Sequence, residues 1–325
     1  MRARTLKTLI TAIALAVGAA PAAGADGLPV PVDQTFGEGV VSADGSSRFV
    51  TLTTSGKTVV MRIASDGGEV EDYRVIDGNY TVPAIAVDGT ASGISTNGMT
   101  LALINPRRTF PRSSTSFQIF QASKSDKLFQ NRQSIRLDGD FSFDALSPDG
   151  ETMYLIEYTD PRDYDSYQVR SMDLATGELD PKPILDSEEE PDDMRGLPQT
   201  RVTSPDGQWE YTLYDGGGSH PFIHALDVID GVTVCIDLEM INSEKTNGAV
   251  MAIADGGEVE LSDRKGDLRA VVDPETFRAT EPGASADTEA EATEPKEGSG
   301  VRSGIVAGGV ALLGIGGLVL LSRRE

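Results

Sequence analysis

"FDALSPDGETMYLIEY", residues 143–158, consists of an apolar run, a Ser-Pro-Asp-Gly turn and a second run rich in β-forming residues. A similar stretch, "TRVTSPDGQWEYTLYD", follows at residues 200–215. An Asx-Gly pair between two runs of this kind is typical of a tight β-hairpin. The sequence therefore predicts the same hairpin twice.

Asx-Gly pairs with such flanks occur five times, at spacings of 53, 52, 57 and 49 residues. The predicted structural turns are Asp44-Gly45, Asn97-Gly98, Asp149-Gly150, Asp206-Gly207 and Asp255-Gly256. Further strand-like runs follow each turn, so that a unit of about fifty residues contains four strands, the pattern of a propeller blade. We expect an all-β fold over residues 28–280, a β-propeller of about five four-stranded blades. Six blades is the alternative and a two-sheet sandwich the third choice.

The two hairpins resemble those of WD40-like, TolB-type and YVTN-type β-propeller repeat proteins, and "MDLATGEL" is similar to the outer turn of the same group. The strings "GDFSFDALSPDG", "DGGGSHPFIHALD" and "CIDL" also resemble an uncharacterised group of secreted, C-terminally membrane-anchored bacterial propeller-like proteins. The resemblance covers about residues 35–280 and implies a fold without implying an activity. Because a propeller ring has to close, residues 28–36 could supply an outer strand to the last blade.

The two ends of the chain predict export and anchoring. Residues 1–25 combine Arg2, Arg4 and Lys7 with a short apolar run and a small-residue cleavage site, the pattern of a signal peptide. Residues 303–321 carry no charge and precede Arg323 and Arg324, which predicts a transmembrane helix with residues 322–325 in the cytoplasm. No LPxTG motif precedes this run, which favours a retained helix over a sortase signal. Residues 281–302 form an acidic Pro/Ala/Thr/Glu stalk that we expect to be disordered.

These features predict a single-pass protein of the bacterial plasma membrane, with the propeller outside the cell. The formal net charge of −23 makes nucleic acid and anionic headgroups poor partners, so that the C-terminal helix is the expected membrane contact. The one cysteine, Cys235, lies in the apolar run "VTVCIDL" and forms no disulfide within the chain.

The longer connections between the predicted strands fall on one face of the propeller, opposite the Asx-Gly turns. Loops on a rigid scaffold commonly carry binding sites, so this face is the candidate site. The candidate binding residues are Arg107, Arg108, Arg112, Tyr158, Asp160, Asp163, Tyr164, Tyr167, Glu189, Asp192, Asp193, Asp215 and His220. Aromatic rings among carboxylates suit an unknown protein, peptide or glycan at the cell surface. The alternative is a solvated surface of an acidic protein.

We expect no cofactor and no metal. His220 and His224 are four residues apart, but a proline lies between them, the segment leads into a strand, and no third ligand is placed by the sequence. With two histidines, one cysteine and no Gly-x-Ser-x-Gly elbow, the sequence favours a ligand- or protein-binding module over an enzyme. A carboxylate-dependent hydrolase or lyase on the same face is the alternative, favoured if two carboxylates meet in a deep pocket.

Overall fold

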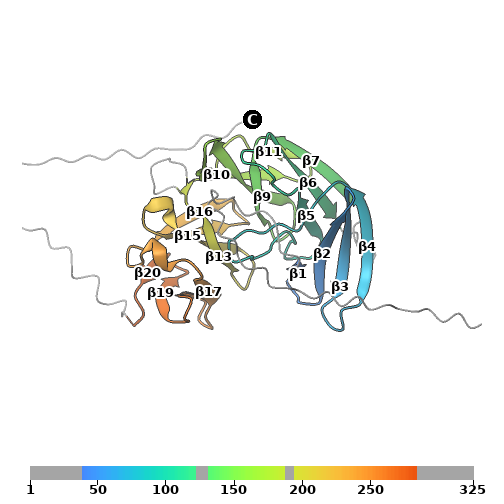
Figure 1. Cartoon of the computed structure of the whole chain (residues 1–325). Coiled ribbons are helices and arrows are strands. Elements are labelled where there is room, and N and C mark those ends of the chain that lie inside the picture. Colours follow the sequence, from blue (N-terminus) through green and yellow to red (C-terminus); the bar gives the residue numbers. More distant parts are fainter. Residues whose placement is uncertain (1–38, 122–130, 187–193, 284–325) are drawn as a thin grey trace, which may run out of the picture. The chain divides into compact units, whose positions relative to one another are not determined.

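The computed structural model describes residues 39–121, 131–186 and 194–283. In these ranges the strands form five antiparallel sheets that follow one another along the chain (Figure 1). The two helices of the described chain are short 3-10 turns, η1 (Gly216–Gly218) and η2 (Ser243–Lys245). The expected all-β fold is confirmed, and five successive antiparallel sheets are consistent with a β-propeller.

The sheets are numbered here in chain order. The first contains β1 (Val40–Val41), β2 (Ser47–Thr54), β3 (Lys57–Ala64) and β4 (Val70–Asp77). The second contains β5 (Thr100–Ile104), β6 (Ser114–Gln121) and β7 (Asn131–Asp138). The third contains β8 (Phe141–Leu146), β9 (Thr152–Asp160), β10 (Asp163–Asp173), β11 (Glu178–Leu179) and β12 (Met194–Arg195). The fourth contains β13 (Pro198–Thr203), β14 (Trp209–Tyr214), β15 (Phe222–Asp227) and β16 (Val232–Asp237). The fifth contains β17 (Val250–Ile253), β18 (Val259–Ser262), β19 (Leu268–Asp273) and β20 (Arg278–Thr280).

The predicted segments at the two ends are not among the described residues. These are the signal peptide, the stalk, the transmembrane helix and the cytoplasmic tail. Within the described ranges, no helix has the length and apolar character needed to cross a membrane.

Two sheets depart from the expected four strands. The second sheet has three, because the outer edge of β5 carries only two isolated bridges, Ile94 with Leu101 and Thr81 with Ile104, in place of a first strand. Gly93, which adopts a φ of 114°, interrupts the extended backbone there, and a Cβ atom at this position would lie 2.7 Å from the carbonyl oxygen of Ala102. The third sheet has five strands, because β11 and β12 both pair with β10.

The turn at Asp149 is built by side chains as well as by backbone. The Ser147 hydroxyl donates to Asp149 Oδ1 at 2.6 Å, and Asp149 Oδ1 also accepts the Glu151 N–H. The Thr152 N–H donates to Ser147 Oγ, and Gly150 adopts a φ of 74°. The same hydrogen bonds recur in the turns that begin at Ser42, Ser95 and Ser204. The repeated unit is therefore Ser-x-Asx-Gly.

The fifth turn is different. Ala254 stands where the other turns have serine, and the Gly257 N–H donates to the Ala254 carbonyl. Gly257, with a φ of 96°, takes the left-handed position, whereas Gly256 does not have a positive φ. The Asp255-Gly256 pair thus lies one residue earlier in its turn than the other four pairs do.

Consecutive sheets pack through shared buried clusters. These clusters join the first sheet to the second, the second to the third, the third to the fourth and the fourth to the fifth. Among the residues described, no such cluster joins the fifth sheet to the first. Each interior sheet therefore has both faces buried, whereas the first and fifth sheets each pack through one face.

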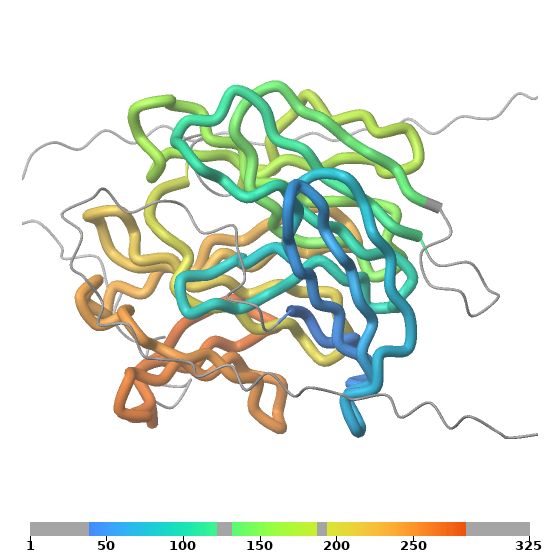
Figure 2. The backbone as a smooth tube through the Cα atoms, turned by 45° about the vertical axis from the view of Figure 1, so that its right-hand side comes forward, coloured from blue at the N-terminus to red at the C-terminus, as the bar shows by residue number. Residues whose placement is uncertain are grey.

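The connection between β4 and the second sheet reaches the fourth sheet (Figure 2). The Val87 N–H donates to the Pro198 carbonyl at 2.9 Å, and the Asp88 N–H donates to the Gln199 carbonyl at 3.2 Å. Ile85 of the same connection is buried in the cluster between the second and third sheets. The connection therefore brings a residue of its own to the edge of the site described next.

Candidate functional site

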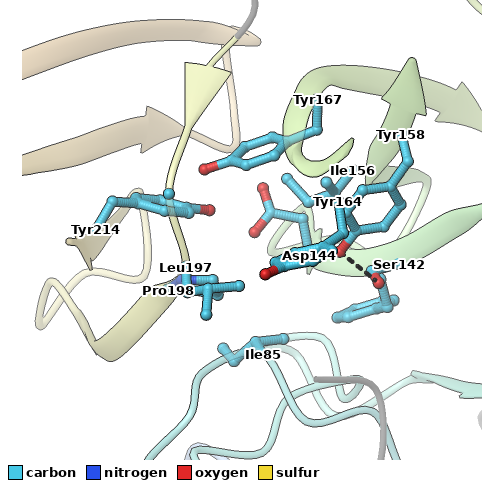
Figure 3. A pocket seen from close by; sticks show the side chains of 12 residues that line it. Ile85, Ser142, Asp144, Ile156, Tyr158, Tyr164, Tyr167, Leu197, Pro198 and Tyr214 are labelled. Carbon is cyan, nitrogen blue, oxygen red and sulfur yellow. Dashed lines mark hydrogen bonds between the residues drawn. The ribbon is translucent and has the colours of Figure 1, made fainter. Parts of the chain in front are cut away.

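A cavity of about 20 Å³ lies where the third sheet, the fourth sheet and the connection between β4 and the second sheet meet. Its polar lining comes from Ser142, Asp144, Tyr158, Tyr164, Tyr167 and Tyr214 (Figure 3). The rest of the wall is formed by Ile85, Phe143, Ile156, Gly196, Leu197 and Pro198. A volume of this size holds about one water molecule, or one small polar group of a larger ligand.

A β-bulge places Asp144 at this cavity. In the pairing of β8 with β9, Phe143 is opposite Leu155 and Ala145 is opposite Tyr154, so that Asp144 has no opposite residue. Bulges bend a strand locally and redirect the side chain of the extra residue. Asp144 is buried in a strand that is otherwise mostly apolar.

Asp144 forms a buried ion pair with Arg201 of β13. The Arg201 guanidinium donates to the Asp144 backbone carbonyl at 2.7 Å and to Oδ1 of the Asp144 carboxylate. Arg201 Nε donates to Thr212 Oγ1. The second carboxylate oxygen, Oδ2, is buried and has no hydrogen-bond partner within the described chain. In Figure 3 the carboxylate faces the hydroxyl groups of Tyr167 and Tyr214.

Tyrosine rings surround this carboxylate. The Tyr167 ring centroid lies 5.7 Å from that of Tyr214 and 6.2 Å from that of Tyr158. The Tyr167 hydroxyl is also buried, and the Tyr214 hydroxyl is its polar neighbour, although among the described residues it makes no hydrogen bond of normal geometry. Burial raises the pKa of Tyr167 and of Tyr214 well above the usual tyrosine value, so both remain neutral phenols. Two buried polar atoms, Asp144 Oδ2 and the Tyr167 hydroxyl, thus line one small cavity.

The outer part of the site is aromatic as well. Phe110 contacts Tyr158 and Tyr164 edge to face, at centroid distances of 5.5 and 6.0 Å. The Ser142 and Tyr158 hydroxyls are 3.3 Å apart. Tyr164 is half-buried and contributes to the mouth of the cavity. Three of the residues predicted from the sequence, Tyr158, Tyr164 and Tyr167, therefore meet at one place.

The predicted arginines do not form a basic surface together. Arg107 and Arg112 are buried, and both contact Asp140 at the start of β8. Arg107 Nη2 lies 2.7 Å from Asp140 Oδ1, and the Arg112 N–H donates to Asp140 Oδ2 at 2.8 Å. These two arginines join the second sheet to the third, whereas Arg108 is exposed.

The predicted carboxylates near β10 have different surroundings. Asp160 pairs with Arg162 at 3.1 Å, and Asp163 pairs with Arg195 at 3.4 Å. Asp165, between Tyr164 and Ser166, is half-buried, and burial raises its pKa. Glu189, Asp192 and Asp193 lie outside the described residues.

Asp215 and His220 hold the loop between β14 and β15. Asp215 Oδ1 accepts the N–H groups of Leu197 and Gly217, so it caps η1 and fixes the wall of the cavity. His220 is exposed and lies 2.8 Å from Asp237. His224 instead points into the fourth sheet, where its ring contacts the Thr233 hydroxyl. Within the described chain no three His, Cys, Asp or Glu side chains come together as a metal site.

The sequence did not single out five residues of the site, which are Phe110, Ser142, Asp144, Arg201 and Tyr214. One signal was present for Asp144, because it is the charged residue in the apolar run "FSFDAL". A charge in such a run is buried only when it is paired or hydrogen-bonded. The sequence contains no comparable signal for its partner, which is 57 residues away.

Solved structures with β-propeller folds are similar to this chain at low sequence identity. TolB from Acinetobacter baumannii is 12% identical, with a TM-score of 0.38, over 70% of this chain and 51% of TolB. A protein assigned as a 6-phosphogluconolactonase from Bacteroides uniformis is 14% identical (TM-score 0.38; 75% of this chain, 83% of that one). Hydrazine synthase from Kuenenia stuttgartiensis is also 14% identical (TM-score 0.36; 77% and 80%). The chain spans about half the length of TolB.

No family model matches the sequence, and no curated protein matches it. The likeness to solved structures concerns the fold alone, since one fold hosts many unrelated functions.

Proposed function

We propose that this protein is a five-bladed β-propeller exported across the bacterial plasma membrane and held there by its C-terminal helix. In this proposal the propeller is a binding module, it uses no cofactor, and its ligand is a glycan at the cell surface. The binding site is the tyrosine-lined cavity together with the loop residues around its mouth. The observation that carries the proposal is the pair of buried polar atoms, Asp144 Oδ2 and the Tyr167 hydroxyl, that line this cavity.

A neutral hydroxyl group satisfies both of these atoms. It can donate to Asp144 Oδ2 and accept from the Tyr167 hydroxyl at the same time. A cationic group is less suitable, because Arg201 already neutralises Asp144 and would repel a second positive charge in the same buried region. The charge of the site therefore favours an alcohol over the ammonium or guanidinium group of a peptide.

The rings at the mouth suit the rest of a sugar. Tyr164, supported by Phe110, offers apolar ring surface against which the C–H groups of a pyranose can pack. The Tyr158 ring beside it carries the Arg107 guanidinium 4.8 Å from its centroid and completes the aromatic wall. A small number of fixed polar groups within an apolar and aromatic lining is the usual composition of a ligand site. In this arrangement one hydroxyl of the sugar enters the cavity, and the ring remains at its mouth.

Within the described chain, the cavity itself does not present the two carboxylates that the alternative enzyme requires. Asp144 is the one carboxylate among the cavity-lining residues in the described ranges, and it is committed to Arg201. A two-carboxylate mechanism requires a second carboxyl group a few ångströms across the substrate. We therefore propose binding and no reaction.

Titration of the full-length protein in detergent with methyl glycosides of glucose, mannose, galactose and N-acetylglucosamine tests the proposal. Saturation-transfer NMR would detect binding of at least one of them. Tyr167→Phe removes one hydroxyl and keeps the ring, and should weaken that sugar roughly tenfold, the effect of about one hydrogen bond. Tyr164→Ala should weaken it as well, whereas Tyr73→Phe and Tyr73→Ala on the first sheet should leave it unchanged.

If the protein binds a lysine-rich or arginine-rich peptide but none of the four sugars, and Tyr164→Ala abolishes this binding, the ligand is not a glycan. The proposal that the protein is a binding module would then stand. Sugar binding that is equal in the wild type, Tyr167→Phe and Tyr164→Ala would refute the site.

A further inference from the structure

The first sheet has one apolar face that no other sheet of the described chain covers. Alternate residues of its strands, such as Phe49, Val60 and Ile76, are buried against the second sheet. The strand register places the other residues on the opposite face, here called the distal face. Its apolar members are Val41, Val50, Leu52, Val59, Met61, Ile63, Val70, Tyr73 and Val75.

These residues form rows across three strands. Leu52, Val59 and Val75 are cross-strand neighbours, and so are Val50, Met61 and Tyr73. Leu52 is 58% exposed, Val75 51% and Tyr73 66%. Of the ten large apolar side chains exposed in the described chain, five are in this sheet. Single exposed apolar residues are common, but a contiguous patch marks a surface that is covered by something.

We propose that residues 28–36 of the same chain, "LPVPVDQTF", lie across the distal face and cover it. The described chain begins at Gly39, immediately before β1, and a Cβ atom at Gly39 would lie 2.7 Å from Val50 Cγ1. The segment therefore enters at the margin of the face itself. Residues 28–38 can extend up to roughly 36 Å, and an eight-residue strand is roughly 26 Å long, so the segment can cross the face.

The composition of the segment fits this role. Leu28, Val30 and Val32 alternate with Pro29 and Pro31, so an extended backbone turns the three apolar side chains to one side. A residue that precedes proline is already biased to extended backbone, which lowers the entropy lost on docking. Proline has no N–H group to donate, and packing on the face of a sheet requires none.

Three other arrangements are less favourable. Direct closure of the ring would place the fifth sheet on the distal face, but no buried cluster of the described residues joins these two sheets. As an outer strand of the fifth sheet, the segment would add to a sheet that already has four strands, β17–β20. A second copy could cover the distal face, but two chains of formal net charge −23 repel each other. A tethered segment avoids this repulsion and acts at a high effective concentration.

Disulfide trapping in the full-length protein tests the proposal, with Cys235→Ser as the background. Val32→Cys combined with Tyr73→Cys should form an intramolecular disulfide under mild oxidation. Val32→Cys combined with Val250→Cys is the matched control, because Val250, 58% exposed against 66% for Tyr73, lies on the fifth sheet. The expected result is a several-fold faster disulfide in the first pair, with the product running as a monomer on a non-reducing gel.

Three results would overturn the proposal. Faster trapping of the Val32/Val250 pair would place the segment on the fifth sheet. Rapid dimer formation by Tyr73→Cys alone, absent from Val250→Cys alone, would assign the distal face to a second copy. Slow trapping of both pairs, with folding confirmed by circular dichroism, would show that the segment does not cover this face. Because sugar binding is measured elsewhere on the molecule, none of these results affects the proposed function.

Discussion

The carboxylate of Asp144 on β8 and the guanidinium of Arg201 on β13 form a buried ion pair between the first strands of the third and fourth sheets. The pair joins two sheets and also orients the carboxylate oxygen that lines the cavity. Scaffold and site therefore depend on the same contact, and the following tests separate their contributions.

Arg201→Ala should lower the free energy of unfolding by about 3–5 kcal/mol, because it leaves the Asp144 carboxylate buried without its counter-charge. Lys57→Ala is the matched control. Lys57 pairs with Asp77 at 2.7 Å, but both side chains are exposed, and its loss should cost less than about 1 kcal/mol. Denaturant titration measures both variants, and similar small losses would show that the Asp144–Arg201 pair does not hold the sheets together.

Gly150→Ala should be more destabilising than Gly45→Ala. The two glycines have nearly the same φ, 74° and 70°, so the backbone strain of adding a side chain is similar. A Cβ atom at Gly150 would lie 2.3 Å from Thr100 Oγ1, whereas one at Gly45 meets nothing within 4 Å. We expect an additional loss of roughly 1–3 kcal/mol at Gly150 from overpacking. Equal melting temperatures would contradict the close packing of the Asp149 turn against the second sheet.

The stability of the protein should fall as the pH falls from about 6.5 to about 4, in part because of His224. Burial lowers the pKa of His224 from 6.5 to about 4. In this pH window the unfolded chain binds a proton at this residue and the folded chain does not, so acid favours unfolding. Above pH 6.5 His224 is neutral in both states and costs no stability. By pH 4 its protonation in the unfolded chain lowers the free energy of unfolding by at most about 3 kcal/mol.

His224→Gln should flatten this part of the pH profile, and His220→Gln should leave it unchanged. The chain has only these two histidines, so each variant serves as the control for the other. The measurement is denaturant titration at pH 7 and at pH 4.5. An unchanged slope in His224→Gln would assign the pH dependence to carboxylates instead.

Deletion of residues 301–325 should release the protein in soluble form if the C-terminal helix is its membrane anchor, as proposed above. Cell fractionation followed by immunoblotting compares the deletion with the full-length chain. Recovery of the shortened protein in the membrane pellet would place an anchor elsewhere in the chain.

The local features of this fold could be predicted from the sequence. A Ser-x-Asx-Gly turn is closed by hydrogen bonds within six residues, so its geometry depends on little beyond its own residues. The repetition of the turn therefore predicted successive antiparallel sheets. The second sheet was expected to have four strands, and the positive φ of Gly93, where its first strand is interrupted, could not be foreseen from the strand pattern.

The site was decided by tertiary structure. The sequence identified Tyr158, Tyr164 and Tyr167 as candidates together with Arg107 and Arg112. The structure places the Arg107 guanidinium 4.8 Å from the centroid of the Tyr158 ring, but it buries both arginines against Asp140. Whether an arginine is exposed or buried depends on the charge that packing brings to it, and Asp140 is 33 residues from Arg107 in the chain. Local sequence determined the turns because their partners are neighbours, and only the tertiary structure could pair charges and rings contributed by different sheets.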